Sequence, residues 1–86
     1  MTESKPGQLY YRDGCHLCEE LVSKLYRGWP DLLDQFEWRN VDDREDWREA
    51  YGLQVPVLIY QGQQLSALVP DLSAVQQRFG APLIPL

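Results

Sequence analysis

Two cysteines separated by two residues, Cys15 and Cys18, constrain this chain more than any other feature of its sequence. They follow a short run of strand-forming residues, Leu9-Tyr10-Tyr11, and a turn signal, Asp13-Gly14. From this point the apolar residues recur at i, i+3, i+4 and i+7, which is typical of an amphipathic helix. The cysteine pair is therefore predicted to lie at the junction between a strand and a helix.

The size and composition of the chain exclude several classes of protein. With 86 residues it has room for one domain, and two cysteines are too few for a small secreted fold held by disulfides. The formal charge of −5 disfavours nucleic acid or an anionic membrane as a partner. The longest apolar run, Val55 to Tyr60, is too short to span a bilayer. We expect a cytoplasmic monomer with a single domain over residues 1–86, of which 1–7 form a loose leader.

The rest of the sequence predicts an α/β domain with the element order β-α-β-α-β-β-α. Apolar and polar residues alternate from Phe36 to Val41, which indicates a half-buried strand, whereas Val55–Tyr60 is apolar on both faces, as a central strand is. Gln61-Gly62 predicts a tight turn into a returning strand, Gln64–Val69. Two parallel strands connected through right-handed crossovers, then a hairpin, give a four-stranded mixed sheet with helices on both faces.

Three helices are predicted around this sheet. The first stops at Gly28 and Pro30, the second begins with Asp43 as its cap, and the third opens at Asp71. Gly52 is expected to end the second helix in the left-handed conformation. Four side chains of the second strand and the second helix are expected to face the core: Trp38, Trp47, Ala50 and Tyr51.

The two thiols are predicted to lie in different environments. Cys15 starts the helix, where unpaired N–H groups and the positive end of the helix dipole lower the pKa of a thiol below its free value of about 8.5. Cys18 shares the apolar face with Leu21, Val22 and Leu25, so its thiol should be sheltered. An exposed attacking thiol beside a buried resolving thiol is the arrangement that dithiol–disulfide exchange needs.

The residues alone leave two other roles open for the cysteine pair. Structural zinc needs four ligands, and His16 lies between the thiols where it could hardly complete a tetrahedron with both. A zinc ion or an iron–sulfur cluster would therefore have to be shared between two chains. The thiols can also be a buried structural pair. We expect redox exchange and no metal site.

Pro56 interrupts an apolar strand pattern, although proline removes a hydrogen-bond donor from a sheet. One explanation is an edge strand or the start of a strand. The other is a cis Val55-Pro56 bond just before the strand. Since only about 5–6% of such bonds are cis, the position of Pro56 does not decide between them.

Cys15-His16-Leu17-Cys18 and Val55-Pro56-Val57 together resemble the thioredoxin superfamily, and the glutaredoxins most closely, over nearly the whole chain. The stretches 14–19 and 51–58 are more specifically similar to a bacterial subgroup of glutaredoxin-like proteins. The resemblance implies a thioredoxin-like fold and a thiol–disulfide oxidoreductase in which Cys15 is the nucleophile and Cys18 the resolving thiol. It also implies a cis Pro56, with the Val55 backbone pairing a bound peptide or glutathione.

The resemblance gives three further residues candidate roles in substrate binding. Arg12 stands where glutaredoxins often carry a basic residue that meets a glutathione carboxylate; the alternative is a solvated surface Arg. His16, if protonated, would favour the Cys15 thiolate, and if merely exposed would do little. Asp71 stands where paired glycines commonly help to hold glutathione, and it can present its carboxylate to a ligand or simply cap a helix.

The expected substrate is a disulfide-containing protein or a glutathione mixed disulfide, and the expected reductant is glutathione or a reductase. No bound cofactor is required. Tyr11 and Trp29 lie near the edges of the motifs and are candidates for lining a substrate groove. The competing hypothesis is a binding module, in which the same fold holds a peptide or partner protein and the thiols have no catalytic use.

Overall fold

The computed structural model describes residues 5–67 and 72–83, and it has the predicted order of strands and helices. Two short 3-10 helices, η1 and η2, are added to that order. The elements are β1 (Gly7–Tyr11), α1 (His16–Gly28), η1 (Pro30–Gln35), β2 (Phe36–Asn40), η2 (Val41–Asp43), α2 (Glu45–Tyr51), β3 (Val57–Tyr60), β4 (Gln63–Ala67) and α3 (Ser73–Phe79).

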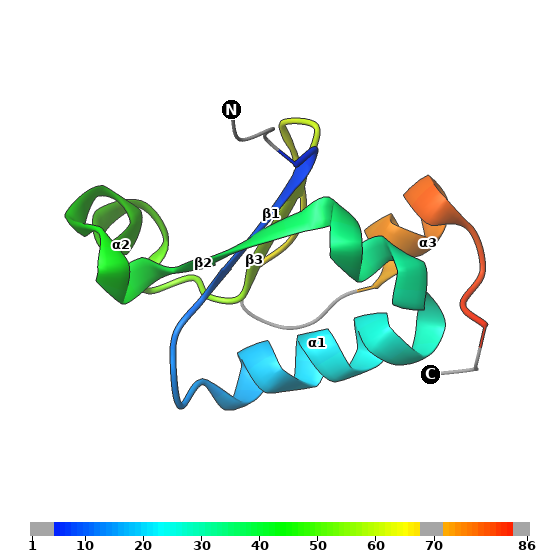
Figure 1. The fold of residues 1–86 in the computed structure, drawn as a ribbon, viewed down its shortest axis with the longest axis horizontal. Coiled ribbons are helices and arrows are strands. Elements are labelled where there is room, and N and C mark those ends of the chain that lie inside the picture. The colour runs from blue at the N-terminus through cyan, green and yellow to red at the C-terminus, as the bar shows by residue number, and fades with distance from the viewer. Residues whose placement is uncertain (1–4, 68–71, 84–86) are drawn as a thin grey trace.

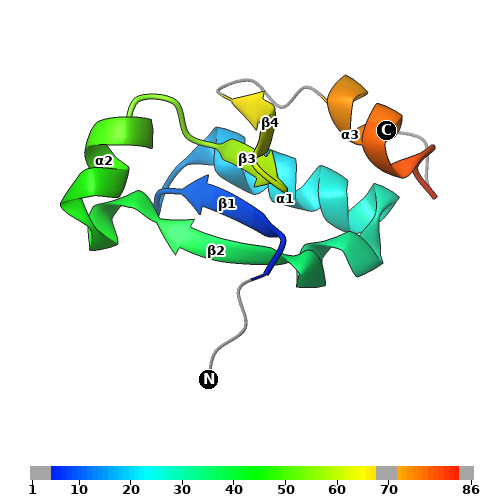
Figure 2. The ribbon, with the colours of Figure 1, turned by 90° about the horizontal axis from the view of Figure 1, so that it is seen from above.

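The four strands form one mixed sheet in the order β2-β1-β3-β4 (Figures 1 and 2). Strand β1 pairs in parallel with β2 and antiparallel with β3, and β3 pairs antiparallel with β4. The prediction that β3 is a central strand is confirmed, since it lies between β1 and β4. Strand β2 is at the edge of the sheet, a position that the sequence did not indicate.

Helices cover both faces of the sheet, as the crossover argument predicted. On one face α1, η1 and α3 pack on the larger apolar cluster, which includes Leu9, Leu21, Leu25 and Val75, each fully buried. On the other face the side chains of α2 pack on a smaller cluster around Tyr10, Val41 and Val57. Figure 1 shows α1 running beneath the strands, with α2 and α3 at opposite ends of the view.

The turn between β3 and β4 explains the predicted hairpin. Gln61 and Gly62 have φ angles of 49° and 80°, and two successive positive φ values are the property of a type I′ turn. This turn matches the twist of paired antiparallel strands, so the chain reverses within two residues. Strand β4 begins at Gln63, one residue before the predicted start, and the predicted end at Val69 lies outside the described residues.

The second helix differs from its prediction in three respects. Asp43 belongs to η2 and the cap of α2 is Arg44, which makes no side-chain cap hydrogen bond. Gly52 has φ −56°, a right-handed value, so glycine is not needed there for a left-handed conformation. The carbonyl oxygen of Arg48 lies 2.5 Å from the place where a Cβ of residue 52 would sit, and this close approach is what favours glycine. Ala50 is exposed rather than inward-facing.

Two further expectations about β1 and β2 need correction. Strand β1 begins at Gly7, so the last residue of the predicted leader is buried in the sheet against the Phe36 ring. Trp38 was expected in the core, but its side chain is 47% exposed. Trp38 pairs with Leu9 in the sheet, yet it belongs to the edge strand, where the helix layer does not fully cover it. Trp47 and Tyr51 do pack against the core.

Candidate functional site

The loop that carries Cys15 is shaped by a turn that connects β1 to α1. The N–H of Cys15 donates to the carbonyl oxygen of Arg12 at 3.2 Å, which closes a four-residue turn. Gly14 has φ +75° within this turn, a conformation that other residues adopt only at a cost. The turn delivers Cys15 to the N-cap position of α1, as the strand–turn–helix pattern predicted.

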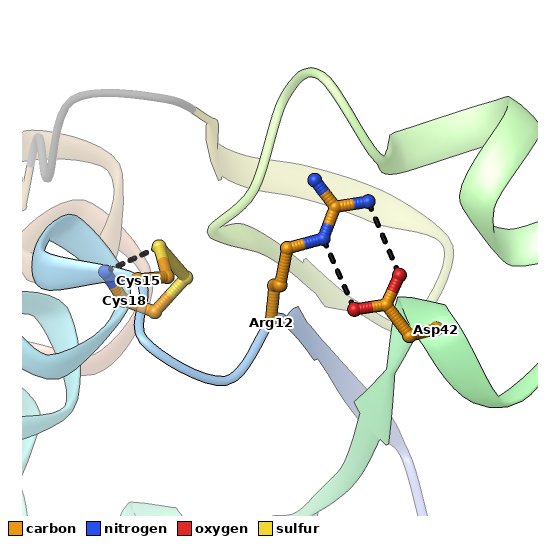
Figure 3. The surroundings of a disulfide bond; sticks show 4 residues. All are labelled: Arg12, Cys15, Cys18 and Asp42. Carbon is orange, nitrogen blue, oxygen red and sulfur yellow. Dashed lines mark hydrogen bonds and ion pairs between the residues drawn. A yellow bond between two sulfur atoms is a disulfide. The ribbon is translucent and has the colours of Figure 1, made fainter.

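Cys15 and Cys18 are joined in a disulfide at the start of α1 (Figure 3). The sulfur of Cys15 also accepts a hydrogen bond from the Cys18 N–H, at 3.1 Å, and so occupies the place of a capping oxygen. Cys15 is half-buried, whereas Cys18 is only 4% exposed. The predicted asymmetry between an accessible thiol and a sheltered one is confirmed.

Pro56 lies at the same end of the central strands as the loop that carries Cys15. The Val55–Pro56 peptide bond is cis, and Pro56 is fully buried directly before β3. Strands β1 and β3 are antiparallel neighbours with Tyr10 opposite Val57, so the residue before Val57 faces the end of β1 that leads to the cysteines. The cis bond and the neighbourhood are those that the resemblance implied. The side chain of Val55 is half-buried and packs against the cluster around Tyr10, Val41 and Val57.

Arg12 is held by a carboxylate. Its Nε and Nη2 donate to the two oxygens of Asp42 at 3.2 and 3.3 Å, and Arg48 makes a second ion pair with Asp42 at 3.4 Å. Figure 3 shows the guanidinium extending from the loop toward Asp42 and away from the disulfide. The sequence did not predict this pair, because Asp42 follows β2 and meets Arg12 only through the parallel pairing of β1 and β2. The anion-binding role of Arg12 stays a prediction.

Within the described residues, no side-chain hydrogen bond or ion pair joins His16 to another predicted site residue. His16 and Leu17, the two residues between the cysteines, are both exposed. Both hypotheses for His16 therefore stay open. Asp71 lies outside the described residues.

Comparison with known proteins agrees with this geometry. The family model of the Glutaredoxin-like domain (DUF836) matches residues 8–81. The chain belongs to the glutaredoxin-like domain family. No curated protein matches it.

Solved structures with the same fold support this family assignment. Protein Ne2328 from Nitrosomonas europaea, solved by solution NMR, is 26% identical with a TM-score of 0.66, over 91% of this chain and 94% of that one. The X-ray structure of the structural genomics target XcR50 from X. campestris is 38% identical with a TM-score of 0.57, over 70% of this chain and 77% of that one. The thioredoxin-like fold is thus shown, and a glutaredoxin-like domain with this cysteine pair has the features of a redox-type thiol site.

The glutaredoxin-like domain also has a groove beside the cysteines, with a volume of about 590 Å³. It begins at Gly14 and Cys18 and runs along α1, with the edge strand β2 on its other side. Tyr11, proposed as a groove residue, does line it; Trp29 instead is buried and donates its indole N–H to the Gly80 carbonyl oxygen at 3.0 Å. The groove is lined by Tyr11, Arg12, Asp13, Gly14, Cys18, Glu19, Val22, Ser23, Tyr26, Leu33 and Trp38.

Part of this groove could have been found from the sequence. Cys18, Glu19, Val22 and Tyr26 follow one another at helical spacing, which places them on one stripe of α1. Trp38 could not have been found, because its place in the groove depends on β2 being an edge strand.

The described part of the glutaredoxin-like domain shows neither a metal centre nor a membrane span. Over residues 5–67 and 72–83, no three His, Cys, Asp or Glu side chains gather in an arrangement that could hold a metal ion. Within the same residues no helix has the length and apolar character that crossing a bilayer requires.

Proposed function

We propose that this glutaredoxin-like domain is a dithiol–disulfide oxidoreductase that reduces protein or glutathione mixed disulfides. The observation that carries the proposal is the Cys15–Cys18 disulfide at the start of α1, with one thiol accessible and the other buried. The cis Pro56 at the same end of the strands supports the proposal, because the backbone of Val55 can pair there with an extended peptide.

The proposed reaction has two displacement steps. The Cys15 thiolate attacks one sulfur of the substrate disulfide, so that a mixed disulfide forms and the first substrate thiolate leaves and takes up a proton. The Cys18 thiol then loses its proton and its sulfur attacks Cys15, which releases the second substrate thiolate and leaves the Cys15–Cys18 disulfide. Two electrons pass from the dithiol to the substrate, and glutathione or a reductase returns them.

The helix start favours the first step. The Cys18 N–H that donates to the Cys15 sulfur would stabilise a thiolate at that position, and the positive end of the α1 dipole acts in the same direction. A stabilised Cys15 thiolate is the attacking group in the first step. Burial keeps Cys18 away from external disulfides until Cys15 carries the substrate.

Arg12, His16 and Asp71 are proposed as substrate-binding residues. Asp42 engages Nε and Nη2 of Arg12, so a glutathione carboxylate would meet the other N–H groups of the guanidinium and would compete with Asp42 for its charge. The proposal requires no metal and no bound organic cofactor, and it places a monomer in the cytoplasm, where reductants keep the dithiol available.

Alkylation of the reduced protein tests the nucleophile. Iodoacetamide should modify Cys15 quickly at neutral pH, with a rate midpoint below the free-thiol value of about 8.5, while Cys18 reacts slowly. Peptide mapping by mass spectrometry separates the two rates. Equal and slow reaction at both cysteines would favour the binding module instead.

Trapping and turnover test the exchange itself. Cys18→Ser should accumulate a mixed disulfide between Cys15 and a substrate, and Cys15→Ser, the matched control, should accumulate none. Turnover of a small mixed disulfide with glutathione, compared with turnover by thioredoxin reductase, identifies the reductant. A folded Cys18→Ser variant that traps nothing, with no turnover from either reductant, would contradict the proposal.

A further inference from the structure

The groove beside the cysteines combines aromatic rings with carboxylates. Tyr26 and Trp38 are 66% and 47% exposed, and Trp38 makes an edge contact with Tyr11 at 6.0 Å between ring centroids. Asp13 and Glu19 line the same groove. Its volume of about 590 Å³ lies within the range of about 300–1,000 Å³ that is usual for ligand pockets.

The charge of this groove is negative. Among the described residues that line it, Arg12 is the one cation, against two carboxylates, and Arg12 is paired with Asp42, which it shares with Arg48. Asp13 accepts a hydrogen bond from the neutral amide of Asn40 at 3.1 Å and forms no ion pair within the described residues. Glu19 is exposed and has no ion-pair partner within the described residues.

We infer that this groove binds a lysine or arginine side chain of the protein substrate, close to the substrate's disulfide. Aromatic faces attract a cation through their quadrupole, and carboxylates add an ion pair, so rings and carboxylates in one groove are complementary to a cationic side chain. The net charge of −5 would also attract a basic substrate over longer range, while it would oppose a second copy of this chain.

The dimensions of the groove fix where the cation should lie in the substrate. Cys18 and Tyr26 are eight residues apart on α1, which corresponds to about 12 Å along the helix axis. An extended chain advances about 3.3–3.6 Å per residue. A basic residue about three positions from the substrate cysteine therefore reaches the part of the groove between Glu19 and Tyr26. This inference rests on the proposed function, since it assigns the substrate class to the same cysteine site.

The test compares peptides joined to Cys15 in the Cys18→Ser protein. Each of three peptides has a single cysteine, and the peptides differ only at the two positions three residues before and three residues after it. Both positions carry Arg in the first peptide, Gln in the second and Leu in the third. Each mixed disulfide is prepared with an activated disulfide, so it forms whether or not the protein is a competent catalyst. Pairs of peptides then compete for Cys15 at equilibrium, and mass spectrometry gives the ratio of the two mixed disulfides. The equilibrium constant for exchange of each peptide with mercaptoethanol is measured separately. It is used to correct the peptide ratio for intrinsic differences between the free peptide thiols.

The Arg peptide should be preferred over the Gln and Leu peptides by about tenfold at low salt, and by less at 0.5 M salt. Glu19→Gln and Trp38→Leu should each reduce the preference severalfold. Glu20→Gln is the matched control: it removes a charge from the adjacent residue, which pairs with Lys24 and is not among the groove residues, so the preference should persist.

Equal ratios for the three peptides, or a preference for Leu, would overturn the inference. A preference that survives both Glu19→Gln and Trp38→Leu would also overturn it, because the cation would then bind elsewhere. These outcomes are separate from failure of the proposed function: an Arg preference at equilibrium in a protein without turnover would support the groove and contradict the enzyme.

Discussion

Replacing Gly14 with alanine isolates the contribution of the turn that presents Cys15. Residue 14 has φ +75°, and apart from residues 13–15 no atom of the described residues lies within 4 Å of the place where a Cβ would sit. A methyl group there meets no steric obstacle, so the cost comes from the backbone conformation alone. For an L-residue in the left-handed region this cost is about 1–2 kcal/mol.

An opposing effect reduces this cost. Alanine restricts the unfolded chain more than glycine does, which stabilises a protein by about 0.4–1 kcal/mol where the native conformation tolerates alanine. The difference leaves Gly14→Ala less stable by about 1 kcal/mol. For a small protein the urea m-value is about 1 kcal/mol/M, so the unfolding midpoint should fall by about 1 M. Gly14→Asn should lose less, because asparagine adopts the left-handed conformation more readily.

Gly62→Ala provides the matched control. Gly62 has a similar φ of 80° and the same open surroundings, but it lies in the β3–β4 turn rather than before the cysteines. Both alanine variants should therefore lose similar stability in urea unfolding of the oxidised protein. Only Gly14→Ala should also slow the alkylation of Cys15, because only the turn that contains Gly14 positions Cys15 at the N-cap of α1. A Gly14→Ala protein as stable as the parent, or one with unchanged Cys15 reactivity, would refute this reasoning.

Three further variants test packing and charge. Leu25→Ala should lower the free energy of unfolding by about 2–5 kcal/mol, because Leu25 is fully buried, whereas Leu25→Met should lose less than about 1.5 kcal/mol; both are read from urea unfolding. Asp42→Asn should cost up to about 1 kcal/mol at low salt and less at high salt, because the Arg12–Asp42 pair is partly exposed, and no salt dependence would contradict this. The hydrogen bond from Arg44 lowers the pKa of Asp46 below its ordinary value of 3.8, so the stabilisation is present above that pH and is lost as the pH falls through the lowered pKa. Asp46→Asn should therefore lose less stability than the parent on acidification below pH 3.8, and identical acid titration curves would exclude this contribution.

Local patterns predicted much of the fold and the thiol site. The period of α1, the Gln61-Gly62 turn and the apolar run of β3 each depend on neighbouring residues, and each lies where its pattern indicated, except that β3 begins at Val57 and not at Val55. The family resemblance placed the cis Pro56 correctly. The errors concern features that need the whole sheet: Trp38 has the alternation of a half-buried strand, but its exposure depends on strand order.

The sequence by itself determined the chemistry: two thiols three residues apart at the start of a helix, one of them on its apolar face. These features follow from the spacing of nearby residues, which the backbone geometry of a helix converts directly into positions. The tertiary structure alone decided what surrounds the thiols. Arg12 meets Asp42 and Trp38 meets Tyr11 because β1 and β2 lie side by side, although Arg12 and Asp42 are 30 residues apart in the chain. Contacts of this kind depend on strand order and register, which local spacing does not specify.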